Sequence, residues 1–252
     1  MFYSLEIDQI FHYFYVFVRL GAMMMLIPGI GEIYVPPRIR LLFAFVLTLA
    51  ITPVLDVNPP AGELLSAETL LLLIKETLIG LFIGTVARIF LNALQITANI
   101  MGLHTSLSSA VMFNPAMGAQ DSVISSLLIM GATAMIFVTN THHLILQALV
   151  GSYDAFPVFD PLPMEDISHH VVGTVAKSFS LGVQMSFPVM IVATVLNVAS
   201  GLLNRLMPQM QVYFMMMPLQ ILAGFVLIGF SISLILSTFI AQFAEFMATL
   251  KL

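Results

Sequence analysis

The 252-residue sequence has no cysteine, and only 8% of its residues are charged. Without cysteine the chain has no disulfide bonds, no thiolate catalysis and no cysteine-ligated metal site. The charged fraction lies far below the roughly 25% of soluble globular domains. Hydrophobic residues make up 60% of the chain, and its mean hydropathy is +1.04. The composition therefore predicts an integral or membrane-assembled protein.

Basic tracts and common catalytic motifs are also missing. The net charge is −5, so the chain lacks the basic surface that nucleic-acid binding requires. We therefore exclude nucleic acid as a partner. No glycine-rich phosphate loop with a following lysine is present, and serine, histidine and aspartate occur without a nucleophile-elbow context. The histidine pairs at 142–143 and 169–170 lack the spacing that places two imidazoles on one helix face, so we interpret them as interfacial residues. We predict no enzyme activity, no metal and no cofactor.

Long apolar segments make up most of the chain, which predicts an all-α membrane fold with no separable soluble domain. Segments three and five are longer than a bilayer requires, so parts of them should extend beyond the lipid or lie against protein. Segment three also holds Gly80 and Gly84, a spacing that allows another helix to approach closely. The six predicted spans are Phe11–Pro28, Ile39–Leu55, Thr69 to about Gly102, Val123 to about Leu149, about His170 to Leu203, and Pro218–Phe246.

Four charged residues, Arg19, Lys75, Glu76 and Arg88, lie within the apolar segments. Each charge deep in a bilayer costs at least about 2.5 kcal/mol, so these residues should pair, face a cavity or sit outside the lipid. We favour a structural pairing such as Arg19 with Glu76. An ion or proton path is the alternative.

The stretch from Met101 to Gln120 combines helix-breaking and apolar residues between two long apolar segments. Irregular backbone survives at membrane depth only where protein or a water-filled cavity covers it. One interpretation is therefore a loop held inside an assembly, across a conduit; the other is a helix end, a turn at Asn114-Pro115 and a new helix start. The residues that carry the first interpretation are Ser106, Leu107, Val111, Met112, Phe113, Asn114, Pro115 and Gly118.

Two methionine triplets, Met23–Met25 and Met215–Met217, stand out in the sequence. Thioether side chains are flexible and polarizable, so they can seal an irregular gap and repack when something passes. For Met215, Met216 and Met217 a sealing role and simple core or lipid-facing filling stay equally open. For the first triplet we favour filling.

Four segments resemble the FliR family in order and spacing: Val35–Leu55, Ala110–Leu128, Thr141–Pro157 and Leu203–Gly224. That family is an export-gate subunit of the bacterial flagellar type III secretion system and has relatives in virulence injectisomes. The resemblance covers nearly the whole chain.

The resemblance implies an all-helical, multi-pass protein of the bacterial inner membrane and the flagellar basal body. One copy would assemble with several copies of FliP and FliQ, contact FlhB, and pass unfolded flagellar export substrates, with the energy supplied elsewhere in the apparatus. It also implies a single FliR-like domain over residues 1–252. About 1–200 would be FliP-like and about 201–252 FliQ-like, built as helical hairpins.

By the same resemblance, Ser106–Gln120 corresponds to a plug loop that closes the channel, with Phe113 as the occluding side chain. The family often has Asp before the proline, whereas this chain has Asn114, so a salt bridge made there by relatives is in doubt. The family's main methionine ring belongs to FliP, so a Met215–Met217 gasket is a separate hypothesis. The alternatives are an injectisome gate subunit with the same mechanism and a secondary transporter; no inverted repeat supports the latter.

Overall fold

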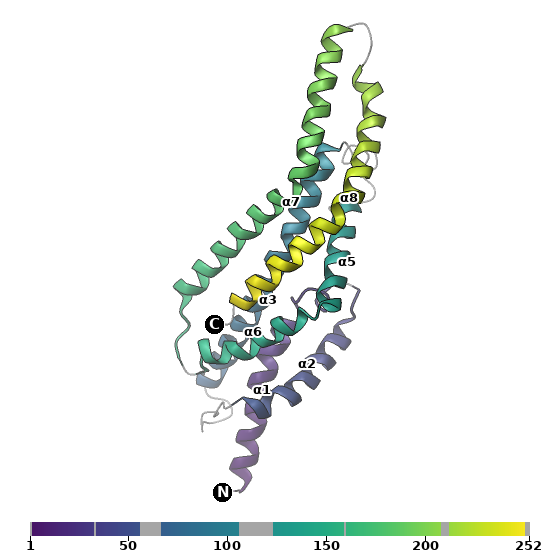
Figure 1. Ribbon diagram of the computed structural model, residues 1–252. Coiled ribbons are helices and arrows are strands. Elements are labelled where there is room, and N and C mark those ends of the chain that lie inside the picture. Colours follow the sequence, from purple (N-terminus) through teal and green to yellow (C-terminus); the bar gives the residue numbers. More distant parts are fainter. Residues whose placement is uncertain are drawn as a thin grey trace. The chain divides into compact units, whose positions relative to one another are not determined.

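The computed structural model describes residues 2–32, 34–55, 67–105, 123–158, 160–207 and 212–249. This part of the chain is helical and contains no strand, which confirms the all-α prediction. Figure 1 shows the helices in chain order. They are α1 (Phe2–Met24), α2 (Pro37–Ile51), the short 3₁₀ helix η1 (Thr52–Val54), α3 (Ala67–His104), α5 (Val123–Val138), α6 (His142–Ala155), α7 (Met164–Leu206) and α8 (Val212–Thr249).

The helices form two compact units. Unit 1 consists of residues 1–90, 137–174 and 244–252, and therefore holds α1, α2, η1, the first part of α3, α6, the start of α7 and the end of α8. Unit 2 consists of residues 91–136 and 175–243, and holds the end of α3, nearly all of α5 and most of α7 and α8. Three long helices therefore contribute residues to both units.

In unit 1, α1 packs closely against α3 because α3 presents two glycines to it. A methyl group on Gly80 would fall onto the carbonyl oxygen of Arg19, and one on Gly84 would lie 2.8 Å from Cβ of Leu26 and 3.0 Å from the Met23 carbonyl oxygen. The backbones can approach this closely only without a Cβ atom. The spacing of Gly80 and Gly84 predicted that another helix approaches α3 closely, and that helix is α1.

Helix α2, which contacts α1, and the η1 turn that follows it bury small and hydroxyl-bearing residues instead of large apolar ones. Ala44, Thr48 and Thr52 are buried, and each threonine hydroxyl donates to the carbonyl four residues earlier, at 2.8 Å for Thr48 and 2.7 Å for Thr52. Large side chains such as Leu42 and Val46 remain 64% and 54% exposed. A helix with this arrangement has its apolar face turned outward, as expected beside lipid or another protein.

In unit 2, the second half of α7 and the first half of α8 run side by side as a hairpin (Figure 1), and Gln220 donates a 2.9 Å hydrogen bond to Asn197 between them. Helix α7 also packs on α3 through Gly182, where a methyl would lie 2.7 Å from the Ala93 carbonyl oxygen. At the same contact Thr97 donates to the carbonyl oxygen of Gly182 at 3.0 Å. Polar bonds and a small residue thus hold these apolar helices together.

Among the described residues, four helices are long and apolar enough to cross a membrane, and α5 with α6 makes a fifth if the pair is one broken span. The predicted count of six is not confirmed. The apolar part of α1, Ile10–Met24, has 15 residues and would extend about 22 Å, less than the roughly 30 Å of a hydrocarbon core. The four spans are Pro37–Val54, Glu68–His104, Met164–Leu206 and Met215–Thr249.

The predicted span from Val123 to about Leu149 is broken into two helices. Helix α5 ends at Val138 and α6 begins at His142. Between them Asn140 adopts φ 57°, the left-handed conformation that asparagine tolerates better than most residues. The hydroxyl oxygens of Thr139 and Thr141 lie 2.7 Å apart across this residue.

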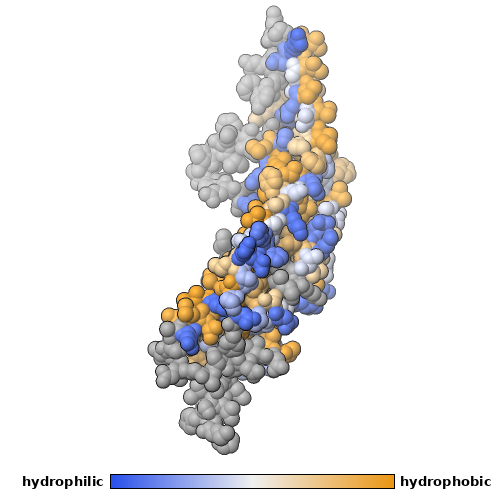
Figure 2. Space-filling view, turned by 90° about the vertical axis from the view of Figure 1, so that its left-hand side faces the viewer, coloured by the Kyte–Doolittle hydropathy of each residue, from blue (hydrophilic) through white to orange (hydrophobic). Residues whose placement is uncertain are grey.

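Large apolar side chains remain exposed in both units. In unit 1 they include Leu42, Leu70 and Leu71, and in unit 2 Val195, Leu222 and Phe230, all at least 61% exposed. Figure 2 shows hydrophobic side chains, in orange, open at the visible surface beside a column of hydrophilic ones. This distribution fits a chain that lipid and other subunits surround.

Candidate functional site: a buried charge cluster

Arg19 lies in the interior of unit 1 with no exposed surface, and all five of its N–H groups have acceptors. Nε and Nη2 donate to Oε2 and Oε1 of Glu76 at 2.6 and 2.9 Å. Nη1 donates to the carbonyl and hydroxyl oxygens of Ser152, both at 3.1 Å, and Nη2 donates to the Phe156 carbonyl at 3.1 Å. The guanidinium thus joins α1 to α3 and to the end of α6.

The surroundings of Arg19 compensate its charge in three ways. Glu76 is also fully buried and supplies the opposite charge. The Ser152 and Phe156 carbonyls belong to the C-terminal end of α6, where the helix dipole favours a cation. The Tyr153 ring faces the guanidinium carbon at 3.8 Å from the ring centroid, a distance at which a cation and an aromatic face attract.

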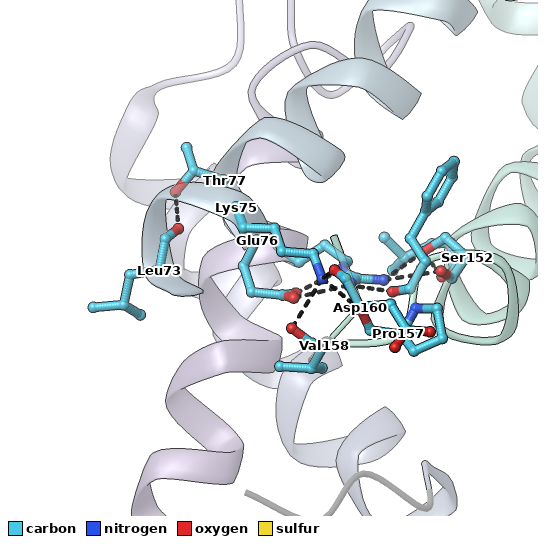
Figure 3. A network of polar contacts seen from close by, with 11 residues as sticks. Leu73, Lys75, Glu76, Thr77, Ser152, Pro157, Val158 and Asp160 are labelled. Atoms are coloured by element: carbon cyan, nitrogen blue, oxygen red, sulfur yellow. Dashed lines mark hydrogen bonds and ion pairs between the residues drawn. The ribbon is translucent and has the colours of Figure 1, made fainter. Parts of the chain in front are cut away.

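Lys75, next to Glu76 on α3, binds the main chain that connects α6 to α7. Its Nζ donates to the carbonyl oxygens of Pro157 at 2.6 Å, Val158 at 2.9 Å and Asp160. Figure 3 shows Lys75 and Glu76 projecting together toward this connection. Two neighbouring residues of α3 therefore tie the connection to the helix, one directly and one through Arg19.

This arrangement determines what the cluster can do. Every N–H of Arg19 has an acceptor, so the guanidinium offers no free donor to a moving ion or proton. Glu76, which accepts two of these bonds, is fully buried. Arginine also does not release its proton in proteins. The geometry favours the structural pairing over the ion or proton path. Such a pair stabilises one arrangement of helices because separating it would leave buried charges uncompensated.

The other sequence-predicted residues are placed as follows. Arg88 is half-buried in α3 and, within the described ranges, has no hydrogen bond or ion pair, so it does not join the cluster. Met215 is 65% exposed near the start of α8, and Met216 and Met217 are half-buried. Whether these three form a gasket stays a prediction.

The predicted plug residues, Ser106, Leu107, Val111, Met112, Phe113, Asn114, Pro115 and Gly118, lie outside the described residues. The helix that precedes them is well anchored in unit 2. Thr105 is buried, its hydroxyl donates to the Met101 carbonyl at 2.8 Å, and a methyl on Gly224 of α8 would lie 2.6 Å from its Cβ. Thr105, the last described residue before the predicted plug, is therefore held against α8.

Sequence reasoning missed the partners supplied by the α6 end and its connection. Ser152 and Phe156 contribute carbonyl oxygens to Arg19, and Pro157 and Val158 contribute theirs to Lys75. Every residue has a carbonyl, so no residue type marks such an acceptor. In the sequence, only the position of the α6–α7 connection, directly after an apolar helix, could have indicated that its carbonyl groups bind these charges.

Comparison with known proteins finds similar proteins over most of the chain. Residues 10–246 match the family described as bacterial export proteins, family 1. The flagellar biosynthetic protein FliR of Caulobacter vibrioides is 39% identical over 220 residues, which cover 86% of this chain and 87% of that protein. FliR of Bacillus subtilis is 29% identical over 87% of this chain and 85% of that protein, and FliR of Escherichia coli is 28% identical over 92% and 87%.

The uncovered apolar helices and the match over nearly the whole chain define a multi-pass membrane protein of bacterial protein export. The chain belongs to the FliR family. It is a subunit of the flagellar export gate in the inner membrane.

Proposed function

We propose that this chain is a noncatalytic subunit that forms, with FliP and FliQ, the channel through which unfolded flagellar proteins cross the inner membrane. One copy assembles with several copies of each partner and contacts FlhB. Within the chain, about 1–200 corresponds to a FliP-like part and about 201–252 to a FliQ-like part.

The observation that carries this proposal is the family match over residues 10–246 in a chain whose long apolar helices are mostly uncovered. Only 17% of the apolar window of α2 is buried, and the same share holds for α7. Lipid or partner helices must cover the rest, because exposed apolar surface of this extent is unfavourable in water. A hetero-oligomeric membrane channel provides both kinds of cover.

The predicted plug, Ser106–Gln120, closes the channel. In the proposed mechanism Phe113 and its apolar neighbours exclude water and ions from the closed channel, and Pro115 and Gly118 allow the segment beyond Thr105 to swing aside. Gly102 lies within α3 and is not a hinge of this movement. The fixed position of Thr105 in unit 2 supports this, because a movable segment needs a firm attachment.

Two measurements test the proposal in order. Native mass spectrometry of the tagged chain, purified from membranes in mild detergent, should find one copy with several copies of two small helical membrane proteins. A lone monomer or a self-oligomer would contradict the assembly.

The second measurement uses the assembled complex in planar bilayers. Deletion of Ser106–Gln120 should raise ion leakage, and Phe113→Ala should raise it to a smaller extent, while both complexes keep their subunit composition. Unchanged conductance in an assembled deletion variant would contradict the plug.

A further inference from the structure

A groove of about 640 Å³ lies within unit 1, between α2 and α6. Its apolar lining comes from Leu47 and Ile51 of α2 and from Leu146 and Val150 of α6. Gly151 lies beside them in α6 and, having no side chain, leaves room for close approach. None of these residues takes part in the charge cluster.

Polar side chains also line this groove. His143, Gln147 and Asp154 are exposed along it, and their spacing of four and seven residues places them on one face of α6. Among the described residues, the side chains of Gln147 and Asp154 have no hydrogen-bond or ion-pair partner. Asp154 also lies in the last turn of α6, where the helix dipole disfavours a carboxylate.

The side chains of Gln147 and Asp154 indicate that the groove binds protein and not lipid. An acyl chain would match Leu47, Leu146 and Val150, but it has no donor for Gln147 or Asp154. Leaving an aspartate against hydrocarbon costs about 2.5–3.5 kcal/mol, and an unsatisfied amide adds to this cost. A protein helix can provide an apolar surface, a hydrogen-bonding side chain and a positive charge together.

We propose that the α2–α6 groove binds an apolar helix of another membrane subunit, with a Lys or Arg of that helix facing Asp154 and a hydrogen-bonding side chain facing Gln147. This inference rests on the proposed function, in which the chain works only in a hetero-oligomer. The groove thereby accounts for part of the surface that α2 leaves uncovered.

Site-specific photo-crosslinking in membranes that contain the whole export apparatus tests the inference. The photoreactive residue p-benzoylphenylalanine replaces Leu146 in the groove. In the matched control it replaces Leu49, which is 50% exposed and lies on the opposite face of α2 from Leu47 and Ile51. Crosslinked peptides are then identified by mass spectrometry.

The expected adduct at position 146 lies on an apolar helix of a different subunit, with a Lys or Arg within two turns, and the Leu49 control does not yield the same peptide. In the same chain Asp154→Lys should lower the yield of this adduct about tenfold by like-charge repulsion, whereas Asp154→Glu should preserve it. Survival of the adduct in Asp154→Glu shows that the groove is still formed after substitution.

An adduct with phospholipid alone, an adduct with a second copy of this chain, or a yield unaffected by Asp154→Lys would overturn the inference. If the complex co-purifies with its partners but position 146 yields no protein adduct, the groove inference fails while the proposed function stands. If the unmodified chain co-purifies with no other subunit, the proposed function fails and the groove inference fails with it.

Discussion

Arg19 on α1 and Glu76 on α3 form a two-pronged ion pair in the interior of unit 1, with 57 residues of chain between them. The remaining N–H groups of the same guanidinium donate hydrogen bonds to the end of α6, so none of its donors is free. Three helices thus meet at one cation. The pair therefore specifies which helices pack together more than it adds net stability.

Removing one partner of this pair should destabilise the protein strongly. Glu76→Gln leaves the Arg19 charge buried without a counter-ion, and we expect a loss of about 3–5 kcal/mol of folding stability. The measurement is the apparent melting temperature of the purified complex. The double variant Arg19→Met/Glu76→Leu should lose less than Glu76→Gln alone, since no buried charge remains. Arg88→Met, at a half-buried residue outside the cluster, is the control. A larger loss in the double variant than in Glu76→Gln would contradict a coupled pair.

Lys75 should control the stability of the α6–α7 connection more than that of the whole fold. Lys75→Met removes the donor from the carbonyls of Pro157 and Val158, but Lys75 is only half-buried, so water can replace it in part. We expect a loss of about 1 kcal/mol and faster proteolysis within 156–163. The exposed Arg205→Met serves as the control. Equal cleavage rates in the two variants would show that Lys75 does not hold the connection.

The fold class followed from the sequence because apolar composition and length are averaged over many residues. The break at Asn140 could not be predicted from the sequence. The apolar residues on both sides of Thr139 to Thr141 kept the mean hydropathy of the segment high. A single left-handed residue ends a helix without changing the hydropathy of the segment around it.

The candidate site was only partly predictable. The cost of a charge in an apolar segment identified Arg19, Lys75, Glu76 and Arg88, but hydropathy could not say which of them meet. The structure brings Arg19 to Glu76, turns Lys75 toward backbone carbonyls and leaves Arg88 apart. These outcomes depend on how α1 and α6 pack on α3, which no local pattern encodes. The plug prediction for Ser106–Gln120 stays a prediction.

The glycine contact between α3 and α1 predicts opposite effects for two similar substitutions. A methyl at Gly80 would fall onto the Arg19 carbonyl oxygen, so Gly80→Ala should cost about 1–3 kcal/mol and disturb the ion pair. Gly21, within α1, has nothing within 4 Å of the same methyl position. Gly21→Ala should therefore be neutral or stabilise by up to about 1 kcal/mol through helix propensity. Melting temperatures of the two complexes provide the comparison, and equal shifts would contradict the close contact.

Substitutions at Asn140 distinguish a broken span from a continuous one by the sign of their effect. If residues 123–149 were one helix, Asn140→Leu would stabilise it, because leucine is the better helix former. At φ 57° the same substitution instead costs about 1–2 kcal/mol, since a Cβ-bearing residue without a short polar side chain is strained there. Asn140→Gly, which adopts this conformation freely, should retain the stability of the unmodified protein. The apparent melting temperature should therefore fall for leucine and stay constant for glycine; the reverse order would mean that α5 and α6 join into one helix in the assembled gate.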